Sequence, residues 1–396
     1  MRVLFLTHRL PYAPDRGDRI RAFHMLRVLS GQADVHVLSL VHDPAEAARA
    51  DSMRRLARAV TTVPTSRVRS YPAGARAVLV RRPLTHAFLD SPLMSAAIER
   101  ILRREGTDVV LAYCSGMARF ALEPPLSSLP FVLDMVDVDS RKWSALSLHA
   151  RAPKRWVYKH EAACLEQFEA VASHRARATL VVNERERDAL AQIAPGADIR
   201  VVGNGIDVEY FRPQNEPDRH ACVVFCGVMN YEPNAEGALW LIHEVWPLVR
   251  TAVPGARLMI VGSDPRRDVR AAGEADASVT VTGRVPDVRP YLWRSAVAVA
   301  PLRTARGVQN KVLEATAAGL PSVVTPAVFD GLPREVRETC RIAGDSASFA
   351  SALVEMLSMP AAERNALVAG ATVEHLTWDR QLAPLVPILE EASRRR

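Results

Sequence analysis

The segment 306–325, RGVQNKVLEATAAGLPSVVT, places two cations and a carboxylate at the start of an expected helix, 309–318. The backbone amides at a helix start carry partial positive charge and, together with Arg306 and Lys311, would form an anion site that suits a diphosphate. Glu314, about one turn further along, can accept hydrogen bonds from a ribose or sugar hydroxyl. The same letters also fit an ordinary strand–loop–helix–strand unit that ends in a capping glycine.

The elements that must position these residues are predicted from the spacing of apolar residues. Short apolar runs alternate with helix-length amphipathic stretches in both halves of the chain, which predicts βαβ units and parallel sheets. A chain of 396 residues is also longer than one hydrophobic core usually serves. We therefore predict an α/β fold with two doubly wound, Rossmann-like domains. The expected strands are 3–7, 35–40, 109–113 and 131–136 in the first half, and 221–227, 257–262, 279–283, 296–301 and 321–325 in the second.

The segment 200–220 contains glycines and prolines that interrupt the alternating pattern, which favours a linker and hinge. This places an N-terminal domain at 1–202 and a C-terminal domain at 203–377. A last amphipathic helix, 378–396, is expected to pack back on the first domain. Because ligands of open α/β sheets bind beyond the carboxyl ends of the strands, we expect two sheets that face each other across a cleft lined by the loops after strands.

Composition excludes several classes of protein. Hydrophobic residues make up 48%, charged residues 24% and aromatic residues 6%, which is typical of a globular α/β protein. The five scattered cysteines are interpreted as reduced core thiols rather than disulfides or metal ligands. The first apolar run is too short for a signal peptide, and no stretch approaches the length of a membrane-spanning helix. A cytoplasmic protein is therefore expected.

The net charge of +7 is unevenly distributed. Residues 1–200 hold 30 Lys and Arg against 21 Asp and Glu, whereas 201–396 hold 21 against 23. The densest basic stretch, 67–82, mixes arginines with apolar residues, which suits a surface that approaches anionic lipid or a phosphorylated acceptor. A solvated helix face is the alternative. Nucleic acid is not expected as a partner, because the arginines are not interleaved with stacking aromatic residues.

The segment 306–325 also resembles the donor-binding signature of the family 4 retaining glycosyltransferases, which have the GT-B fold. That signature reads roughly K-x-x-E-A-x-A-x-G-x-P-V-V, and Lys311 and Glu314 stand at its charged positions. The resemblance implies that Glu314 contacts the nucleotide ribose. The family commonly has an earlier glutamate that faces the donor sugar, and Arg306 stands at that position here. We expect Arg306 to engage phosphate instead.

Two more segments of the second half resemble donor-binding elements of this family. In 226–249, Gly227 and Asn234 occupy the stretch in which the family often has cations for the diphosphate, so charge neutralisation is expected to shift to other residues. In 283–302, the resemblance implies that backbone around Val285 contacts the nucleobase. The expected donor-binding residues are Glu314, Gly307, Asn310, Val285, Arg284, Gly227, Asn234 and Arg303.

Two segments of the first half resemble the acceptor side of the same family. The loop in 7–30 leads into a helix expected to begin at about Asp18, and Gly17, Asp18 and Arg19 are the acceptor-side candidates. In 131–143, Asp134, Asp137 and Asp139 are expected at the end of a strand and beyond it, pointing at the cleft. The family's histidine position is Val136, so Asp137 joins Arg306 and Lys311 as the catalytic candidates. No cofactor is expected, and Mg²⁺ is not expected to be required.

The order of these segments resembles the sugar transferases associated with exosortase (PEP-CTERM) and exopolysaccharide systems. This resemblance implies transfer of a sugar, with retention, from a nucleotide diphosphate sugar to a glycan or lipid-linked acceptor. The location would be cytoplasmic, with peripheral contact to the inner face of a membrane. A nucleotide-sugar 2-epimerase of the same fold and a non-catalytic protein that binds sugar nucleotides remain as alternatives.

Overall fold

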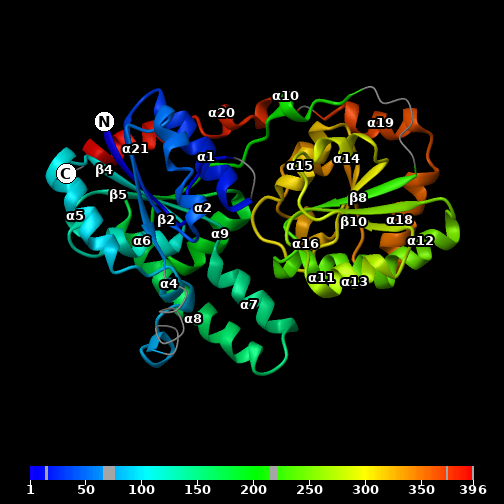
Figure 1. Cartoon of the computed structure of the whole chain (residues 1–396), viewed down its shortest axis with the longest axis horizontal. Helices are drawn as coiled ribbons and strands as arrows, with labels where there is room; N and C mark the ends of the chain where they lie inside the picture. Colours follow the sequence, from blue (N-terminus) through cyan, green and yellow to red (C-terminus); the bar gives the residue numbers. More distant parts are fainter. Residues whose placement is uncertain (14–16, 66–75, 215–220, 372, 395–396) are drawn as a thin grey trace. The chain divides into compact units, whose positions relative to one another are not determined.

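Apolar runs of the sequence form parallel strands in two separate sheets, each covered by helices (Figure 1). The computed structural model describes residues 1–13, 17–65, 76–214, 221–371 and 373–394. The first unit comprises Met1–Asn204 and Gln381–Arg396, and the second comprises Gly205–Arg380. Most of the basic stretch 67–82 lies outside the described residues.

The first unit contains a seven-stranded parallel sheet with the order β3-β2-β1-β4-β5-β6-β7. The chain builds outward from β1 in one direction and then from β4 in the other, so the strand order reverses between these two neighbours. Such a point is where open α/β sheets bind ligands. The strands are β1 (Arg2–Thr7), β2 (Asp34–Val41), β3 (Ala59–Pro64), β4 (Val109–Tyr113), β5 (Phe131–Val136), β6 (Ala178–Val181) and β7 (Ile199–Val201).

Helices cover both faces of this sheet (Figure 1). Because both faces are buried, the central strands are apolar throughout, and all five residues of β4 are buried. The helices are α1 (Gly17–Ser30), α2 (Pro44–Ala47), α4 (Leu84–Phe88), α5 (Leu93–Glu105), α6 (Ser115–Leu122), α7 (Asp139–His149), α8 (Lys154–Arg175), α9 (Glu184–Ile193) and α21 (Leu385–Arg394), with the 3-10 helices η1 (Ala50–Arg55) and η2 (Leu126–Ser128).

The second unit contains a six-stranded parallel sheet with the order β10-β9-β8-β11-β12-β13. Here the strand order reverses between β8 and β11. The loop after β8 leads into α11, and the loop after β11 leads into α15. The strands are β8 (Cys222–Cys226), β9 (Arg257–Val261), β10 (Val279–Val281), β11 (Val297–Ala300), β12 (Ser322–Val324) and β13 (Cys340–Ile342).

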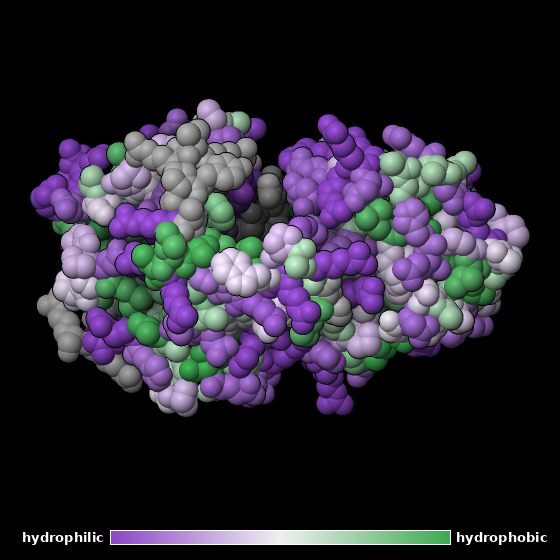
Figure 2. Space-filling view, turned by 90° about the horizontal axis from the view of Figure 1, so that it is seen from below, coloured by the Kyte–Doolittle hydropathy of each residue, from purple (hydrophilic) through white to green (hydrophobic). Residues whose placement is uncertain are grey.

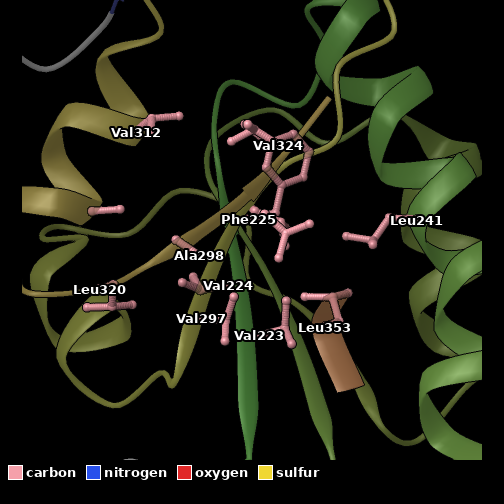
Figure 3. Packing of buried hydrophobic residues seen from close by; sticks show 14 of the residues in the cluster. Val223, Val224, Phe225, Leu241, Val297, Ala298, Val312, Leu320, Val324 and Leu353 are labelled. Carbon is pink, nitrogen blue, oxygen red and sulfur yellow. The ribbon is translucent and has the colours of Figure 1, made fainter. Parts of the chain in front are cut away.

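The core of the second unit lies on both faces of β8 and β11. Figure 3 shows Val312 and Leu320 on one side of these strands and Leu241 and Leu353 on the other. The helices are α10 (Val208–Phe211), α11 (Glu232–Trp240), α12 (Trp246–Ala252), α13 (Arg267–Glu274), α14 (Arg289–Trp293), α15 (Asn310–Ala317), α16 (Pro326–Phe329), α17 (Arg334–Arg337), α18 (Ser346–Ser358), α19 (Ala361–Ala369) and α20 (Trp378–Gln381), with the π-helix η3 (Leu241–Val245) and the 3-10 helix η4 (Glu374–Leu376).

The nine strands predicted from the sequence are confirmed, but four others were missed. Of these, β3, β7 and β13 are the outermost strands of their sheets. An edge strand has a neighbour on one side only, so its sequence needs no long apolar run; β7 and β13 contain three residues each. The fourth, β6, lies inside the first sheet but contains four residues.

The C-terminal segment, predicted as a helix interrupted by prolines, forms the two helices α20 and α21. The break between them falls at 382–384, where Pro384 has no amide hydrogen with which to continue α20. Arg200 of β7 pairs with Glu391 of α21 at 2.9 Å. Leu385 and Leu389 on the same helix are fully buried, so α21 is part of the first unit's core.

Candidate functional site

In the second unit, the point where strand order reverses brings together two segments that are 77 residues apart. Lys311 of α15 donates a hydrogen bond from Nζ to Oδ1 of Asn234 of α11, with 2.7 Å between the atoms. Asn234 in turn donates from Nδ2 to the carbonyl oxygen of Val228, at 2.9 Å. This second bond fixes which side of the amide faces Lys311. The structure therefore joins two of the residues that the sequence assigned to the donor site.

The surroundings of Lys311 are largely apolar. Its Nζ lies 4.7 Å from the centre of the Phe225 ring, and burial lowers the pKa of Lys311 to about 8. Burial also raises the pKa of Glu314 to about 7, while the positive charge of Lys311 acts in the opposite direction. The pKa of the Cys226 thiol is raised to about 12, first by burial and then by Glu314. In a site of low polarity, the cation gains much from a bound anion.

Two glycines allow the loops after β8 and β9 to approach each other. A Cβ at Gly262, whose φ is +149°, would lie 1.7 Å from the carbonyl oxygen of Gly227. A Cβ at Gly227 would lie 2.8 Å from Nδ2 of Asn234 and 3.2 Å from Nζ of Lys311. Gly227 was predicted as a site residue, whereas Gly262 was seen only as the end of a strand. Both positions need a residue without a side chain.

The loop that precedes α15 also depends on close contact between glycines. Gly307 has a φ of +62°, and a Cβ at Gly331 would lie 2.2 Å from its carbonyl oxygen. Gln309 precedes α15 but makes no side-chain capping bond to the helix. Its Nε2 instead donates to the carbonyl oxygen of Arg306, at 3.1 Å. The helix begins at Asn310 and ends at Ala317, close to the predicted bounds.

The remaining donor candidates are more exposed. Arg303 is exposed and Arg306 is half-buried, and both lie in the loop after β11. Arg284, with a side chain that is 64% exposed, has a nitrogen 4.0 Å from a carboxylate oxygen of Asp264. Val285 is half-buried beside it.

Arg289, at the start of α14, was not named by sequence reasoning. Arg289 lies 3.8 Å above the ring of Tyr210 and pairs with Asp287 at 2.6 Å. Tyr210 belongs to α10, and its pKa is raised first by burial and then by Asp287, with a smaller contribution from Glu314. The aromatic ring thus lies in the neighbourhood of Glu314. The only sequence signal for this arrangement was the pairing of opposite charges two residues apart, at 287 and 289.

In the first unit, the structure places Arg19 inside the fold. Its side chain pairs with Glu46 at 3.1 Å and donates to the hydroxyl of Tyr12 at 3.0 Å. Arg19 is 5% exposed, so its contacts join the first turn of α1 to Tyr12 and Glu46. Gly17 is the first residue of that helix, one position earlier than predicted, and Asp18 follows it.

The aspartates after β5 have different environments. Asp134 was expected to point at the cleft from the end of β5, but it is fully buried. It accepts a hydrogen bond from Arg21 at 2.8 Å. That part of the prediction was wrong, because Asp134 is the partner of a buried cation. Asp137 and Asp139 are half-buried, and Asp139 pairs with Lys142 one turn along α7.

The loops at the first unit's reversal point carry residues that the sequence did not single out. His8, which follows β1, has Nδ1 3.5 Å from the sulfur of Cys114, which follows β4. The His8 ring also stacks on Tyr113, with 5.7 Å between the ring centres. Cys114 has a positive φ of +70°. Val136, the last residue of β5 and the position that the resemblance assigns to the family's histidine, also has a positive φ, of +67°. Such backbone angles are unusual for residues other than glycine and cluster at functional sites.

Among the described residues, no group of three or more His, Cys, Asp or Glu side chains could hold a metal ion. No helix in the described part of the chain is long and apolar enough to cross a membrane.

Residues 220–359 match the family model described as "Glycosyl transferases group 1". This match contains the loop after β8, Asn234, Lys311 and Glu314. A comparison of the sequence with curated proteins finds no match.

Solved structures of similar fold cover almost the whole chain. Sucrose-phosphate synthase from Thermosynechococcus elongatus has a TM-score of 0.74 at 14% identity, with all of both chains covered. HepE from Anabaena in complex with UDP and glucose has a TM-score of 0.70 at 12% identity, with 99% of this chain and 100% of that chain covered. An E. coli structure, "Trehalose-6-phosphate from E. coli bound with UDP-2-fluoro glucose", has a TM-score of 0.66 at 12% identity, with 100% of both covered.

At these identities, the structural likeness establishes the fold, while the family match concerns the second unit. Together they support a glycosyltransferase. Residues 220–359 match the glycosyl transferases group 1 model, and the chain as a whole has the GT-B fold of two Rossmann-like units.

Proposed function

We propose that this protein transfers a sugar, with retention, from a nucleotide diphosphate sugar that binds to the second unit. The observation that carries the proposal is the contact between Lys311 and Asn234 at the reversal point between β8 and β11. Open α/β sheets bind ligands at such a point. The HepE and E. coli structures named above hold UDP and a UDP-sugar analogue, which supports a nucleotide sugar as the donor here.

In the proposed complex, the diphosphate lies at the start of α15. Burial disfavours the charged form of Lys311, and the diphosphate supplies an anionic partner for that charge. The backbone amides of the first helical turn face the phosphates. Arg306 and Arg303, in the preceding loop, add positive charge. Glu314 accepts hydrogen bonds from the ribose hydroxyls, and backbone around Val285 contacts the base.

These groups would lower the barrier to transfer by stabilising the leaving nucleoside diphosphate. Negative charge builds up on the diphosphate as the bond to the sugar breaks, and fixed cations stabilise it most in that state. The departing phosphate can take the acceptor's proton, so no pair of carboxylates is needed. Asp137, in the first unit, is the proposed side chain on the acceptor side.

The acceptor is proposed to be a glycan or a lipid-linked glycan in exopolysaccharide assembly, met at the inner face of a membrane. Support comes from the sequence resemblance and from the excess of 9 positive charges in residues 1–200. Such an excess of positive charge favours binding to anionic surfaces.

Turnover of a donor panel tests the proposal. UDP-, GDP- and ADP-sugars are incubated with the protein and with acceptor glycans, and both the released nucleoside diphosphate and the anomeric configuration of the product are measured. We expect one donor to be consumed, with retention, and Lys311→Ala to lower kcat by about 100- to 1000-fold.

Control variants and the alternative activities are distinguished in the same assay. Arg267→Ala removes an exposed cation of the second unit and should leave turnover unchanged. A changed nucleotide sugar formed without any acceptor would identify an epimerase. Binding without turnover of any donor would identify a non-catalytic protein.

A further inference from the structure

Most of the exposed large apolar side chains in the described part of the chain belong to the first unit. Seven of the eleven large hydrophobic residues that are exposed in the described part of the chain lie between positions 79 and 171. Two of them flank the turn between α7 and α8: Leu148 is 69% exposed and Trp156 is 60% exposed. Single exposed apolar residues are common, but a tryptophan exposed beside a leucine on one helical hairpin is not.

Exposed cations occur in the same stretch of sequence. Arg151, Lys154, Arg155 and Lys159 are all exposed, and residues 143–160 include no Asp or Glu. We name Leu148, Arg151, Lys154, Arg155, Trp156 and Lys159 together the α7–α8 surface. The stretch of sequence that carries this surface is therefore strongly basic.

The helices that carry this surface are held firmly together. Trp143 of α7 packs against Tyr158 of α8, with ring centres 5.2 Å apart. The Trp156 ring stacks on His160, with ring centres 5.7 Å apart and an angle of 16° between the planes. The exposed tryptophan is thus oriented by its own helix and does not need to be ordered when a partner binds.

A second apolar and basic segment, 76–89, is joined to the same helix by hydrogen bonds at Leu84 and Thr85. Leu79 and Val80 are 84% and 52% exposed, and residues 76–89 again include no Asp or Glu. The buried Glu161 of α8 accepts hydrogen bonds from the amide of Thr85, at 2.9 Å, and from that of Leu84. In Figure 2, viewed from the side on which α7 and α8 lie in Figure 1, apolar and strongly polar atoms adjoin on the first unit.

We propose that the α7–α8 surface docks on an anionic lipid bilayer. Trp156 and Leu148 would enter the interfacial layer, where tryptophan is favoured, and the four cations would meet lipid phosphates. This proposal rests on the function proposed above, sugar transfer at the inner face of a membrane. It names the part of the chain that contacts the membrane. Residues 76–82, in the segment joined to α8, extend the contact.

Charge argues against a second copy of this chain as the occupant. A two-fold contact would place this cationic surface against itself, and like charges brought together oppose association. An anionic bilayer supplies the opposite charge and also accepts the apolar side chains.

Vesicle sedimentation tests this proposal. The full chain is mixed with vesicles of phosphatidylcholine alone and of phosphatidylcholine with phosphatidylglycerol. We expect binding to the anionic vesicles, weakened by salt. K154Q/R155Q/K159Q should lower the partition coefficient by about 100-fold, because each cation near the surface contributes roughly a factor of five. Trp156→Ser should lower it by about tenfold.

A matched control separates this surface from net charge. R100Q/R103Q/R104Q removes three exposed cations from α5 of the same unit and should leave vesicle binding within about twofold of the unchanged chain. Equal loss in both triple variants, or no binding to anionic vesicles, would overturn the proposal. Thermal unfolding confirms that each variant is folded. A dimer in sedimentation analysis that Trp156→Ser dissociates would instead identify a second copy as the occupant.

Donor turnover makes the two proposals distinguishable. The α7–α8 variants should retain the release of nucleoside diphosphate from the soluble donor, because none of their residues belongs to the second unit. If the unchanged chain turns over a donor but does not bind anionic vesicles, the docking proposal fails and the proposed function stands. If it binds anionic vesicles but turns over no donor, the proposed function fails and the docking proposal stands.

Discussion

At the scale of single residues, the proposed chemistry depends on two charged side chains, Lys311 and Glu314, that are half-buried before any ligand arrives. Burial lowers the pKa of Lys311 and raises that of Glu314, so each side chain is partly desolvated in the unliganded protein. Asn234 orients the ammonium of Lys311 through a hydrogen bond. A site arranged in this way needs little rearrangement when it binds an anion, which is the condition for strong electrostatic stabilisation.

Donor binding is expected to be tightest between about pH 7 and pH 8. A bound diphosphate stabilises protonated Lys311, whose pKa in the free protein is about 8, so affinity falls as pH rises through that value. Glu314 accepts hydroxyl hydrogen bonds best as a carboxylate. Because its pKa is about 7, affinity also falls as pH decreases through that value, and each limb approaches tenfold per pH unit.

Calorimetric titration with UDP across this range measures both limbs. In Glu314→Gln, the loss of UDP affinity at low pH should become smaller. The loss that remains should come from protonation of the nucleotide's own phosphate. In Lys311→Gln the alkaline limb should disappear. An affinity that does not change between about pH 7 and pH 9.5 would contradict the role of Lys311.

Sequence reasoning named individual residues of the candidate site but not their environments. Lys311 and Asn234 were both named, but their hydrogen bond joins loops that only the sheet order brings together. Arg19 was named for its place at a helix start, and its burial against Glu46 could not be read from that position. The assignment of Asp134 was wrong because its partner, Arg21, lies 113 residues away.

At the scale of elements, the loops after β8 and β9 are shaped by backbone contact. Gly262 leaves room for the carbonyl oxygen of Gly227, and the Gly227 amide donates to Val261 at 2.9 Å. These contacts fix the loop that leads to Asn234. The long central strands were predictable because they are apolar over most of their length, whereas this crossing of two loops leaves no periodic signal.

Gly262→Ala is expected to destabilise the second unit and to weaken donor binding. The new Cβ would overlap the Gly227 carbonyl oxygen at 1.7 Å, at a backbone φ that alanine rarely adopts. We expect a loss of at least about 2 kcal/mol in the free energy of unfolding. Denaturant unfolding measures this loss.

Gly255→Ala is the matched control for that substitution. Its Cβ would meet no atom within 4 Å, so its stability should stay within about 0.5 kcal/mol of the unchanged chain. Equal losses in the free energy of unfolding for the two variants would contradict a special role of the close contact at Gly262.

At the scale of the whole molecule, the first unit is assembled from both ends of the chain, while the second is continuous. Each unit has its own sheet and its own buried core. The helix α21 belongs to the first unit, where its fully buried Leu385 and Leu389 contribute to the core. The two units should therefore respond differently to removal of that helix.

Truncation after Arg380 tests this organisation. Loss of α21 exposes apolar surface of the first unit and removes the Arg200–Glu391 pair, so the first unit should unfold at a lower temperature. The second unit retains its whole core and should keep its unfolding transition and its affinity for UDP. Calorimetry would show one transition shifted and one unchanged; equal shifts in both would contradict the division.

The central claim is that a nucleoside diphosphate binds beside Lys311 and Asn234. The most direct test is calorimetric titration of UDP, GDP and ADP into the unchanged chain, Lys311→Ala, and the surface control Arg267→Ala. We predict that one nucleotide binds to the unchanged chain and to Arg267→Ala with equal affinity, and at least about tenfold more weakly to Lys311→Ala. Equal binding to all three proteins, or binding of none of the nucleotides, would contradict the account.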